Sequence, residues 1–170
     1  MDGTVRHCLS WAEVREVMAS NALEKLGRLP EQLGCYRQQT EVMRSEFVTV
    51  GDFILHHRFG FPYLTRPEDG KKTDDDDGGE GVPRTTSGGS ERVVWAKNDF
   101  PYALEADISH FLLWSLQPLP PQQLEQLIQQ HVVPDEEFVY FVNPPALQSV
   151  QNVFHAHVLT QPTLRTRWPF

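Results

Sequence analysis

The feature that most constrains this chain is the stretch Val153-Phe154-His155-Ala156-His157-Val158-Leu159. Apolar residues flank two histidines that are two positions apart, a pattern typical of a β-strand with both imidazoles on one face. A second apolar run, at residues 108–114, predicts another strand and carries His110. If the two strands are neighbours, the three imidazoles converge on one site.

The order of the other elements predicts an α+β fold. Helical patterns occur at residues 10–26, 30–47 and 53–58, the first opened by a capping box of Ser10 and Glu13. Two strands (93–96 and 108–115), a helix (120–131) and two more strands (138–142 and 153–160) follow. Because short loops join the strands of each pair, we expect an antiparallel β-sheet with a packed helix, preceded by a three-helix N-terminal segment.

A polar segment at residues 65–92 separates these regions. It is acidic, rich in Gly, Ser and Asp, and has Val82 as its one large apolar residue. Such a segment buries too little apolar surface to offset the entropy lost on ordering, so we predict a disordered linker. The expected organisation is a helical segment at 1–64, a linker at 65–92 and an α+β region at 93–170.

The charge of the chain limits its partners. A formal net charge of −8 argues against nucleic acid and against an anionic membrane surface. No apolar run reaches the roughly 20 residues of a membrane helix, and no secretory signal is visible. Cys8 and Cys35 are too few for a disulfide framework. We expect a cytoplasmic protein, with the nucleus as a second location, and leave its oligomeric state open.

Short motifs are spread over nearly the whole chain. They are Ser10-Trp11, Leu26-Gly27-Arg28, Asp52-Phe53-Ile54-Leu55, Asn98-Asp99-Phe100-Pro101-Tyr102, His110-Phe111-Leu112-Leu113-Trp114, Tyr140-Phe141-Val142-Asn143-Pro144 and His155-Ala156-His157-Val158. Through these motifs the chain resembles the uncharacterised N-acetylglucosamine-induced protein family of fungi and protists. That family's name records induction by a sugar and implies no chemistry.

A second resemblance covers the region from residue 93 onward. Its motifs are, in order, Phe100-Pro101, His110-Phe111-Leu112-Leu113, a helix, Val142-Asn143, Gln148-Ser149-Val150 and Val153-x-His155-x-His157. In order and approximate spacing they resemble the histidine-triad (HIT-like) superfamily of nucleotide hydrolases and transferases. The chain departs from that superfamily where Pro144 and Pro145 replace glycines and where Val153 replaces the first histidine of the triad.

The superfamily resemblance implies roles for six residues. His155 would be the nucleophile that attacks phosphorus, and His157 and His110 would stabilise the transferred phosphoryl group. Asn143, Ser149 and Gln148 would contact the ligand. Because Val153 supplies no ring N–H, and one lost donor costs on the order of 100-fold in rate, we expect a nucleotide or sugar-phosphate binding protein with slow hydrolase or transferase activity.

Two other interpretations of the histidines stay open. Three imidazoles with an open fourth position are typical of catalytic zinc, but these strands carry no carboxylate to orient the ligands. We therefore expect neither a metal nor a cofactor. In the other interpretation the histidines satisfy one another inside a pocket that binds a ligand or a protein without chemistry. Arg28 and Arg37 are phosphate contacts only if the N-terminal helices cap the pocket.

Overall fold

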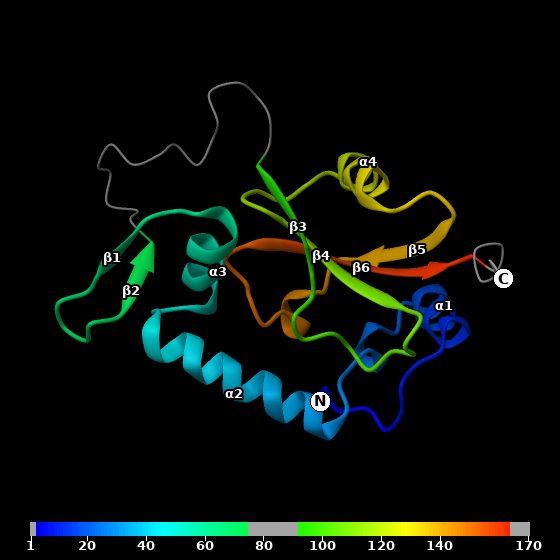
Figure 1. The fold of residues 1–170 in the computed structure, drawn as a ribbon, viewed down its shortest axis with the longest axis horizontal. Coiled ribbons are helices and arrows are strands. Elements are labelled where there is room, and N and C mark those ends of the chain that lie inside the picture. Colours follow the sequence, from blue (N-terminus) through cyan, green and yellow to red (C-terminus); the bar gives the residue numbers. More distant parts are fainter. Residues whose placement is uncertain (1–2, 75–91, 164–170) are drawn as a thin grey trace, which may run out of the picture.

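The computed structural model describes residues 3–74 and 92–163 (Figure 1). Its elements are, in chain order, α1 (Trp11–Ser20), η1 (Leu23–Lys25), α2 (Pro30–Glu46), α3 (Val50–Phe59), β1 (Tyr63–Thr65), β2 (Lys72–Asp74), β3 (Val93–Lys97), β4 (Ser109–Ser115), α4 (Pro121–His131), β5 (Glu136–Phe141), η2 (Pro145–Leu147) and β6 (Phe154–Pro162). The predicted α+β class is confirmed. Among the described helices, none is long and apolar enough to cross a membrane.

Four strands form one antiparallel sheet in the order β3-β4-β6-β5. β3 pairs with β4, and β5 with β6, as the short connections predicted. β4 and β6 join these two pairs at the centre of the sheet, where His110 lies opposite Leu159 and Leu112 lies opposite His157. In this register His157 is two residues away from the position directly opposite His110, so the two side chains are diagonal neighbours on the same face.

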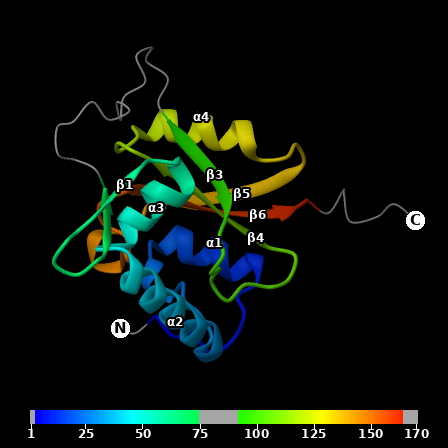
Figure 2. The same ribbon diagram turned by 60° about the vertical axis from the view of Figure 1, so that its left-hand side comes forward.

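Different helices cover the two faces of the sheet (Figure 1 and Figure 2). On one face, α4 packs Leu124 and Ile128 against Ala156 and Val158 of β6. Because side chains alternate along a strand, the odd-numbered residues of β6 point to the other face, which the N-terminal helices cover. The histidines therefore lie between the sheet and the N-terminal helical segment.

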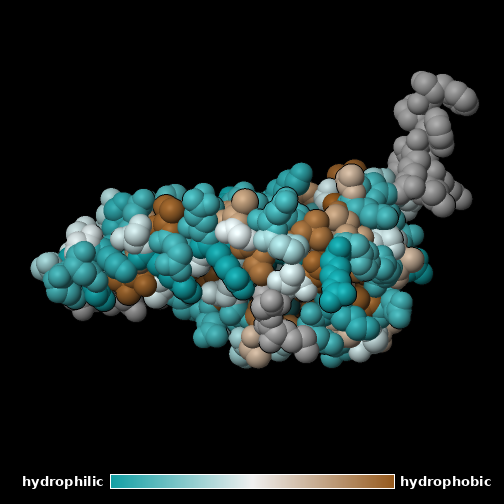
Figure 3. Space-filling model, turned by 90° about the horizontal axis from the view of Figure 1, so that it is seen from below, coloured by the Kyte–Doolittle hydropathy of each residue, from teal (hydrophilic) through white to brown (hydrophobic). Residues whose placement is uncertain are grey.

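α2 and α3 lie over the histidine face of the sheet. α2 begins at Pro30, as predicted, and buries Leu33. α3 begins at Val50, three residues earlier than predicted, because Thr49 and Asp52 form a capping box there. Seen from the side of α2, the surface is mostly hydrophilic, and hydrophobic residues show only in small separate areas (Figure 3).

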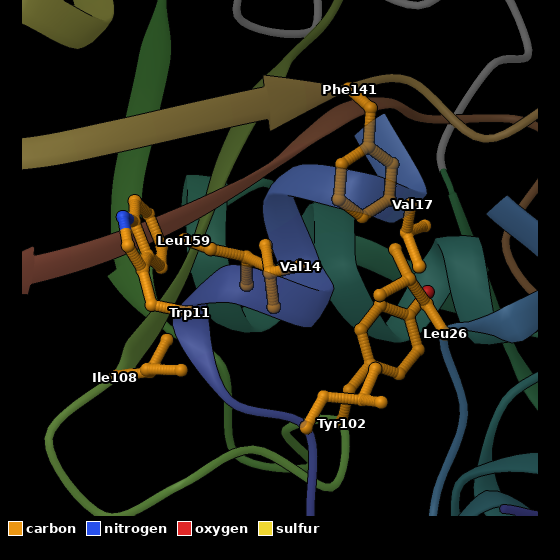
Figure 4. Packing of buried hydrophobic residues seen from close by; sticks show 9 residues of the cluster. Trp11, Val14, Val17, Leu26, Tyr102, Ile108, Phe141 and Leu159 are labelled. Atoms are coloured by element: carbon orange, nitrogen blue, oxygen red, sulfur yellow. The ribbon is translucent and has the colours of Figure 1, made fainter. Parts of the chain in front are cut away.

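α1 packs against the sheet through Trp11, Val14 and Val17, which meet Phe141 and Leu159 (Figure 4). Its predicted capping box is confirmed. The helix ends at Ser20, however, and not at residue 26. Asn21 adopts the left-handed conformation, with φ 51°, which asparagine tolerates better than most residues and which commonly ends helices.

The prediction of a disordered linker is wrong for residues 65–74, because β1 and β2 pair as an antiparallel hairpin that begins at Tyr63 and ends at Asp74. A hydrogen bond and a cation–π contact hold this hairpin against the N-terminal helices. Asp52 Oδ1 accepts the backbone N–H of Asp74 at 3.0 Å, and Lys72 Nζ lies 5.2 Å from the ring centre of Phe47. The prediction considered only apolar burial and therefore missed these contacts. Residues 75–91, the rest of the predicted linker, lie outside the described ranges.

Candidate functional site

The three predicted histidines share one site. Ring centres are 5.2 Å apart for His110 and His157, and 5.4 Å apart for His155 and His157. All three side chains are buried. The predicted convergence is confirmed, whereas the roles assigned to the three residues stay predictions. His155 and His157 line cavities, and His110 contacts His157 without lining them.

His155 is held in one neutral tautomer. Its Nδ1 lies 3.1 Å from the carbonyl oxygen of Val153. Since a carbonyl only accepts, Nδ1 carries the proton and Nε2 keeps its lone pair. Burial lowers the pKa of His155, and the hydrogen bond to Val153 offsets part of that effect. Among the described residues none forms a hydrogen bond with Nε2, so His155 has the form that a nucleophilic imidazole requires.

A fixed proton order links His110 to His157. The backbone N–H of Tyr102 donates to Nδ1 of His110 at 3.2 Å, so the proton of neutral His110 is on Nε2. That N–H donates to Nδ1 of His157 at 3.0 Å. Protonating either ring would therefore place two N–H groups face to face. Burial lowers the pKa of His110 to about 3 and lowers the pKa of His157 well below its ordinary value.

Asn143 completes this network. Its amide nitrogen lies 3.1 Å from His157 Nε2 and 3.1 Å from the Tyr102 hydroxyl oxygen. Because His157 carries its proton on Nε2, it donates to Asn143. The Asn143 amide is therefore assigned in the flipped orientation, with Oδ1 in place of Nδ2, so that Oδ1 accepts hydrogen bonds from both His157 and the Tyr102 hydroxyl. Asn143 thus has two partners within the protein, and its predicted contact with a ligand stays a prediction.

Two cavities are lined by His155 and His157, and a third space, an outer groove, adjoins the first of them. The inner cavity, of about 90 Å³, lies between α2, α3 and the sheet, and the side cavity, of about 220 Å³, lies towards η1 and η2. The outer groove, of about 760 Å³, runs between α2 and residues 148–152. It shares with the inner cavity the lining residues Tyr36, Thr40, Val50, Ser149 and Val150. The N-terminal helices therefore cap the histidines, as a phosphate contact of Arg28 or Arg37 requires.

Arg28 brings a positive charge to the inner and side cavities. Its guanidinium carbon lies 4.2 Å from the ring centre of Tyr36 and 5.3 Å from that of Tyr102. Nε and Nη2 donate to the carbonyl oxygen of Phe100 at 3.1 and 2.7 Å. None of the ion pairs in the described ranges includes Arg28. Burial lowers the pKa of Arg28, and its charge contributes to the low pKa of His157.

The other predicted residues lie around these spaces in different ways. Ser149 lines all three. Gln148 lines only the outer groove, and its amide donates to the backbone carbonyl of Asn143 at 2.6 Å, which fixes the loop. Val153 is 2% exposed and packs in an apolar cluster with Ile54 and Trp114. Its side chain therefore adds no polar group to the site.

The histidine geometry does not suit a shared metal ion. In the part of the chain that the structure describes, no three His, Cys, Asp or Glu side chains are arranged to hold one. Both ring nitrogens of His110 are engaged, one by the Tyr102 N–H and the other by His157. A cation bound to all three rings would have to break this pair of hydrogen bonds.

Asn98 and Tyr102 also contact the histidines, although the sequence pattern predicted no role for them. Asn98 accepts the N–H of Phe100 at 3.0 Å and lies against the ring of His110. The ring of Tyr102 stacks on His157 with centres 5.4 Å apart, so it excludes water from the imidazole. Both residues belong to the motif at 98–102. The signal that could have found Tyr102 is an aromatic residue in the turn-rich segment that connects the two strands at 93–97 and 109–115.

Comparison with known proteins places the chain in a family. The family model described as "Protein of unknown function (DUF3605)" matches residues 10–161. The chain is similar to the uncharacterized protein YPL067C of Saccharomyces cerevisiae, with 24% identity over 88% of this chain and 77% of that one. It is also similar to N-acetylglucosamine-induced protein 1 of Candida albicans, with 20% identity over 88% of this chain and 67% of that one.

A solved structure shares the fold. The crystal structure of HTC1 superposes with a TM-score of 0.59 and 22% identity, over 94% of this chain and 88% of that one. At this identity the similarity concerns the fold alone. Because the matching family model spans most of the sequence, the chain belongs to the DUF3605 family of proteins of unknown function.

Proposed function

We propose that this chain binds a nucleotide or sugar phosphate and that His155 gives it a slow nucleotidyl hydrolase or transferase activity. The observation that carries the proposal is the neutral His155, which lines the inner cavity, has Nδ1–H on the Val153 carbonyl and keeps a lone pair on Nε2. The resemblance of residues 93–170 to the histidine-triad superfamily supports the same role for His155. The buried, aromatic surroundings support it too, since they disfavour protonation of the ring.

The sizes of the spaces suggest how such a ligand would lie. Pockets for whole small ligands are typically about 300–1,000 Å³. The inner cavity, at about 90 Å³, suits a phosphoryl group, whereas the outer groove, at about 760 Å³, suits a nucleoside or a sugar. The ligand would therefore place its phosphorus near His155 and the rest of the molecule between α2 and residues 148–152.

The reaction would proceed in two displacements at phosphorus. Nε2 of His155 attacks, the bond from phosphorus to the leaving group breaks, and the leaving group departs with the electron pair. Water or another acceptor then attacks the phosphorus and loses its proton to solvent, the bond between phosphorus and Nε2 breaks, and its electron pair returns to Nε2, so that His155 is again neutral. Val153 offers the leaving group no proton, so Ser149 or water supplies it. One missing donor of this kind lowers the rate by on the order of 100-fold.

The second candidate function is binding without chemistry. It is favoured by the partners of the other two imidazoles, since the N–H of His110 is committed to His157 and the N–H of His157 to Asn143. Neither ring then has an N–H left for a transition state. In that case the same cavity recognises a phosphate-bearing ligand, and turnover is absent.

Incubation with nucleoside phosphoramidates, dinucleoside polyphosphates and nucleotide sugars separates the two functions. Product is followed by chromatography, and a nucleotidyl adduct by intact-protein mass spectrometry. His155→Ala should abolish both product and adduct, while the control His131→Ala, at the exposed end of α4, should retain both. Thermal stabilisation by these compounds without product would favour the binding function. Neither product nor stabilisation with any compound would refute the proposal.

A further inference from the structure

We infer that Arg28 is the anion anchor of this site, so that the N-terminal segment and the sheet together form one composite phosphate-binding pocket. This inference rests on the proposed function and adds its recognition element. It assigns ligand selection to charge: the group held beside His155 must be an anionic phosphoryl group, and the uncharged remainder of the ligand contributes less.

Arg28 has no counter-charge in the described part of the chain. Arg28 is half-buried and lines both cavities that meet at His155 and His157, yet the described ranges contain no carboxylate paired with it. The nearby Asp99 pairs with Arg58 instead. A partly buried charge without a partner loses some of its hydration, and stacking on two tyrosine rings offsets only part of that cost. An anionic ligand would supply what the protein does not.

The guanidinium of Arg28 keeps donor capacity for a ligand. Nε and Nη2 donate to Phe100, but Nη1 takes part in no hydrogen bond within the described ranges. The two rings and the Phe100 carbonyl restrict the plane of the guanidinium, so Nη1 is oriented before a ligand arrives. Arginine held in this way binds phosphate oxygens well, because less side-chain entropy is lost on binding.

Backbone hydrogen bonds hold the segment that carries Arg28. The Val5 N–H donates to the Arg28 carbonyl at 2.9 Å, and the Arg28 N–H donates to the Gly3 carbonyl at 2.9 Å. Next to it, a Cβ atom at Gly27 would lie 2.5 Å from the Gly3 carbonyl oxygen, so only glycine fits. The Ala103 N–H also donates to the Gly27 carbonyl at 2.7 Å, so the backbone beside Arg28 is joined to the loop between β3 and β4, as a preformed binding site requires.

A purely structural Arg28 would also contact Phe100 and the tyrosines, so the test must measure charge recognition. We would determine Kd values of AMP, adenosine and inorganic phosphate by titration calorimetry for the wild-type protein, Arg28→Gln and Arg28→Lys. Arg15→Gln removes the same charge from the exposed surface of α1 and is the matched control. Melting curves without ligand verify that each variant is folded.

If Arg28 is the anion anchor, the wild-type protein binds AMP more tightly than adenosine, and Arg28→Gln removes this preference. AMP binding should weaken roughly 10- to 100-fold, as expected for a charge-assisted hydrogen bond, while adenosine binding changes little. Arg28→Lys should keep part of the preference and Arg15→Gln all of it. Should Arg28→Gln fail to fold, the Lys variant decides, since a purely structural role predicts that its AMP-to-adenosine ratio equals that of the wild type.

Two further results would overturn the inference in distinguishable ways. If Arg28→Gln keeps the wild-type preference for AMP, or loses AMP and adenosine binding equally, Arg28 is not the anchor, and the proposed function stands. If the wild-type protein binds neither AMP nor inorganic phosphate, the pocket does not recognise phosphate. In that case the proposed function fails together with the inference.

Discussion

Lowering the pH from 7 to 5 should destabilise the fold, because its buried histidines resist protonation. His110 has an ordinary pKa of about 6.5 in the unfolded chain and about 3 in the folded protein. Between these values the unfolded state binds a proton that the folded state does not, so the free energy of unfolding falls as the pH falls. For His110 alone, the loss between pH 7 and pH 5 is about 2 kcal/mol.

Other groups set the useful pH window. Burial also lowers the pKa of His155 and of His157, so these residues add to the loss in the same direction. The pKa of Glu13 is lowered to about 2, chiefly by the Ser10 N–H. Its stabilising effect is present above its ordinary pKa of 4.5 and is lost only below that value. Measurements between pH 5 and 7 therefore isolate the histidines.

His110→Gln tests this account. The glutamine oxygen can accept the Tyr102 N–H and its amide can donate to His157, so the substitution keeps both hydrogen bonds and removes the titration. Urea unfolding at pH 7 and pH 5, followed by tryptophan fluorescence, gives the free energies. The variant should lose about 2 kcal/mol less than the wild type over this interval. Equal losses in the two proteins would refute the reasoning.

Three further predictions concern stability and are measured by urea unfolding. Asp52→Ala should cost about 1–2 kcal/mol, because it removes the capping box of α3 and the bond to the Asp74 N–H; an unchanged value would contradict this role. Gly51→Ala places Cβ 1.8 Å from Asn152 Oδ1, so it should stabilise α3 only in an Asn152→Ala background, by about 0.5–1 kcal/mol. Ile128→Ala should cost about 2–5 kcal/mol, whereas exposed Gln129→Ala should change stability by less than about 0.5 kcal/mol; similar costs would contradict the packing of α4.

Much of the fold could be predicted from side-chain patterns. The alternation around His155 and His157 assigned both residues to one face, and the short loops predicted the pairing of β5 with β6. The end of α1 could not be predicted in this way, because it depends on the backbone conformation of Asn21. The hairpin of β1 and β2 was also missed, because its contact with α3 is a hydrogen bond from the backbone N–H of Asp74 to the Asp52 carboxylate and not an apolar contact.

The candidate site was predictable in its members and less so in its connections. The spacing of the histidines indicated that they meet, as the ring distances confirm. It did not indicate that the N–H of His157 donates to Asn143. That direction follows from the backbone N–H of Tyr102, which fixes the proton of His110, and a pattern of side chains contains no information on this backbone group. The presence of Arg28 at the site could not be predicted either, because Arg28 is far from the histidines in the sequence and only the fold brings it to the same cavity.

The central claim is that Nε2 of His155 presents a lone pair to a bound phosphoryl group. Long-range ¹⁵N–¹H correlation spectra of histidine-labelled protein at pH 7, with and without AMP, measure this directly. The account predicts that His155 is the Nδ1–H tautomer without ligand, as its bond to Val153 requires, and that AMP shifts the Nε2 resonance of His155. An Nε2–H tautomer, or a His155 resonance that saturating AMP leaves unchanged, would contradict it.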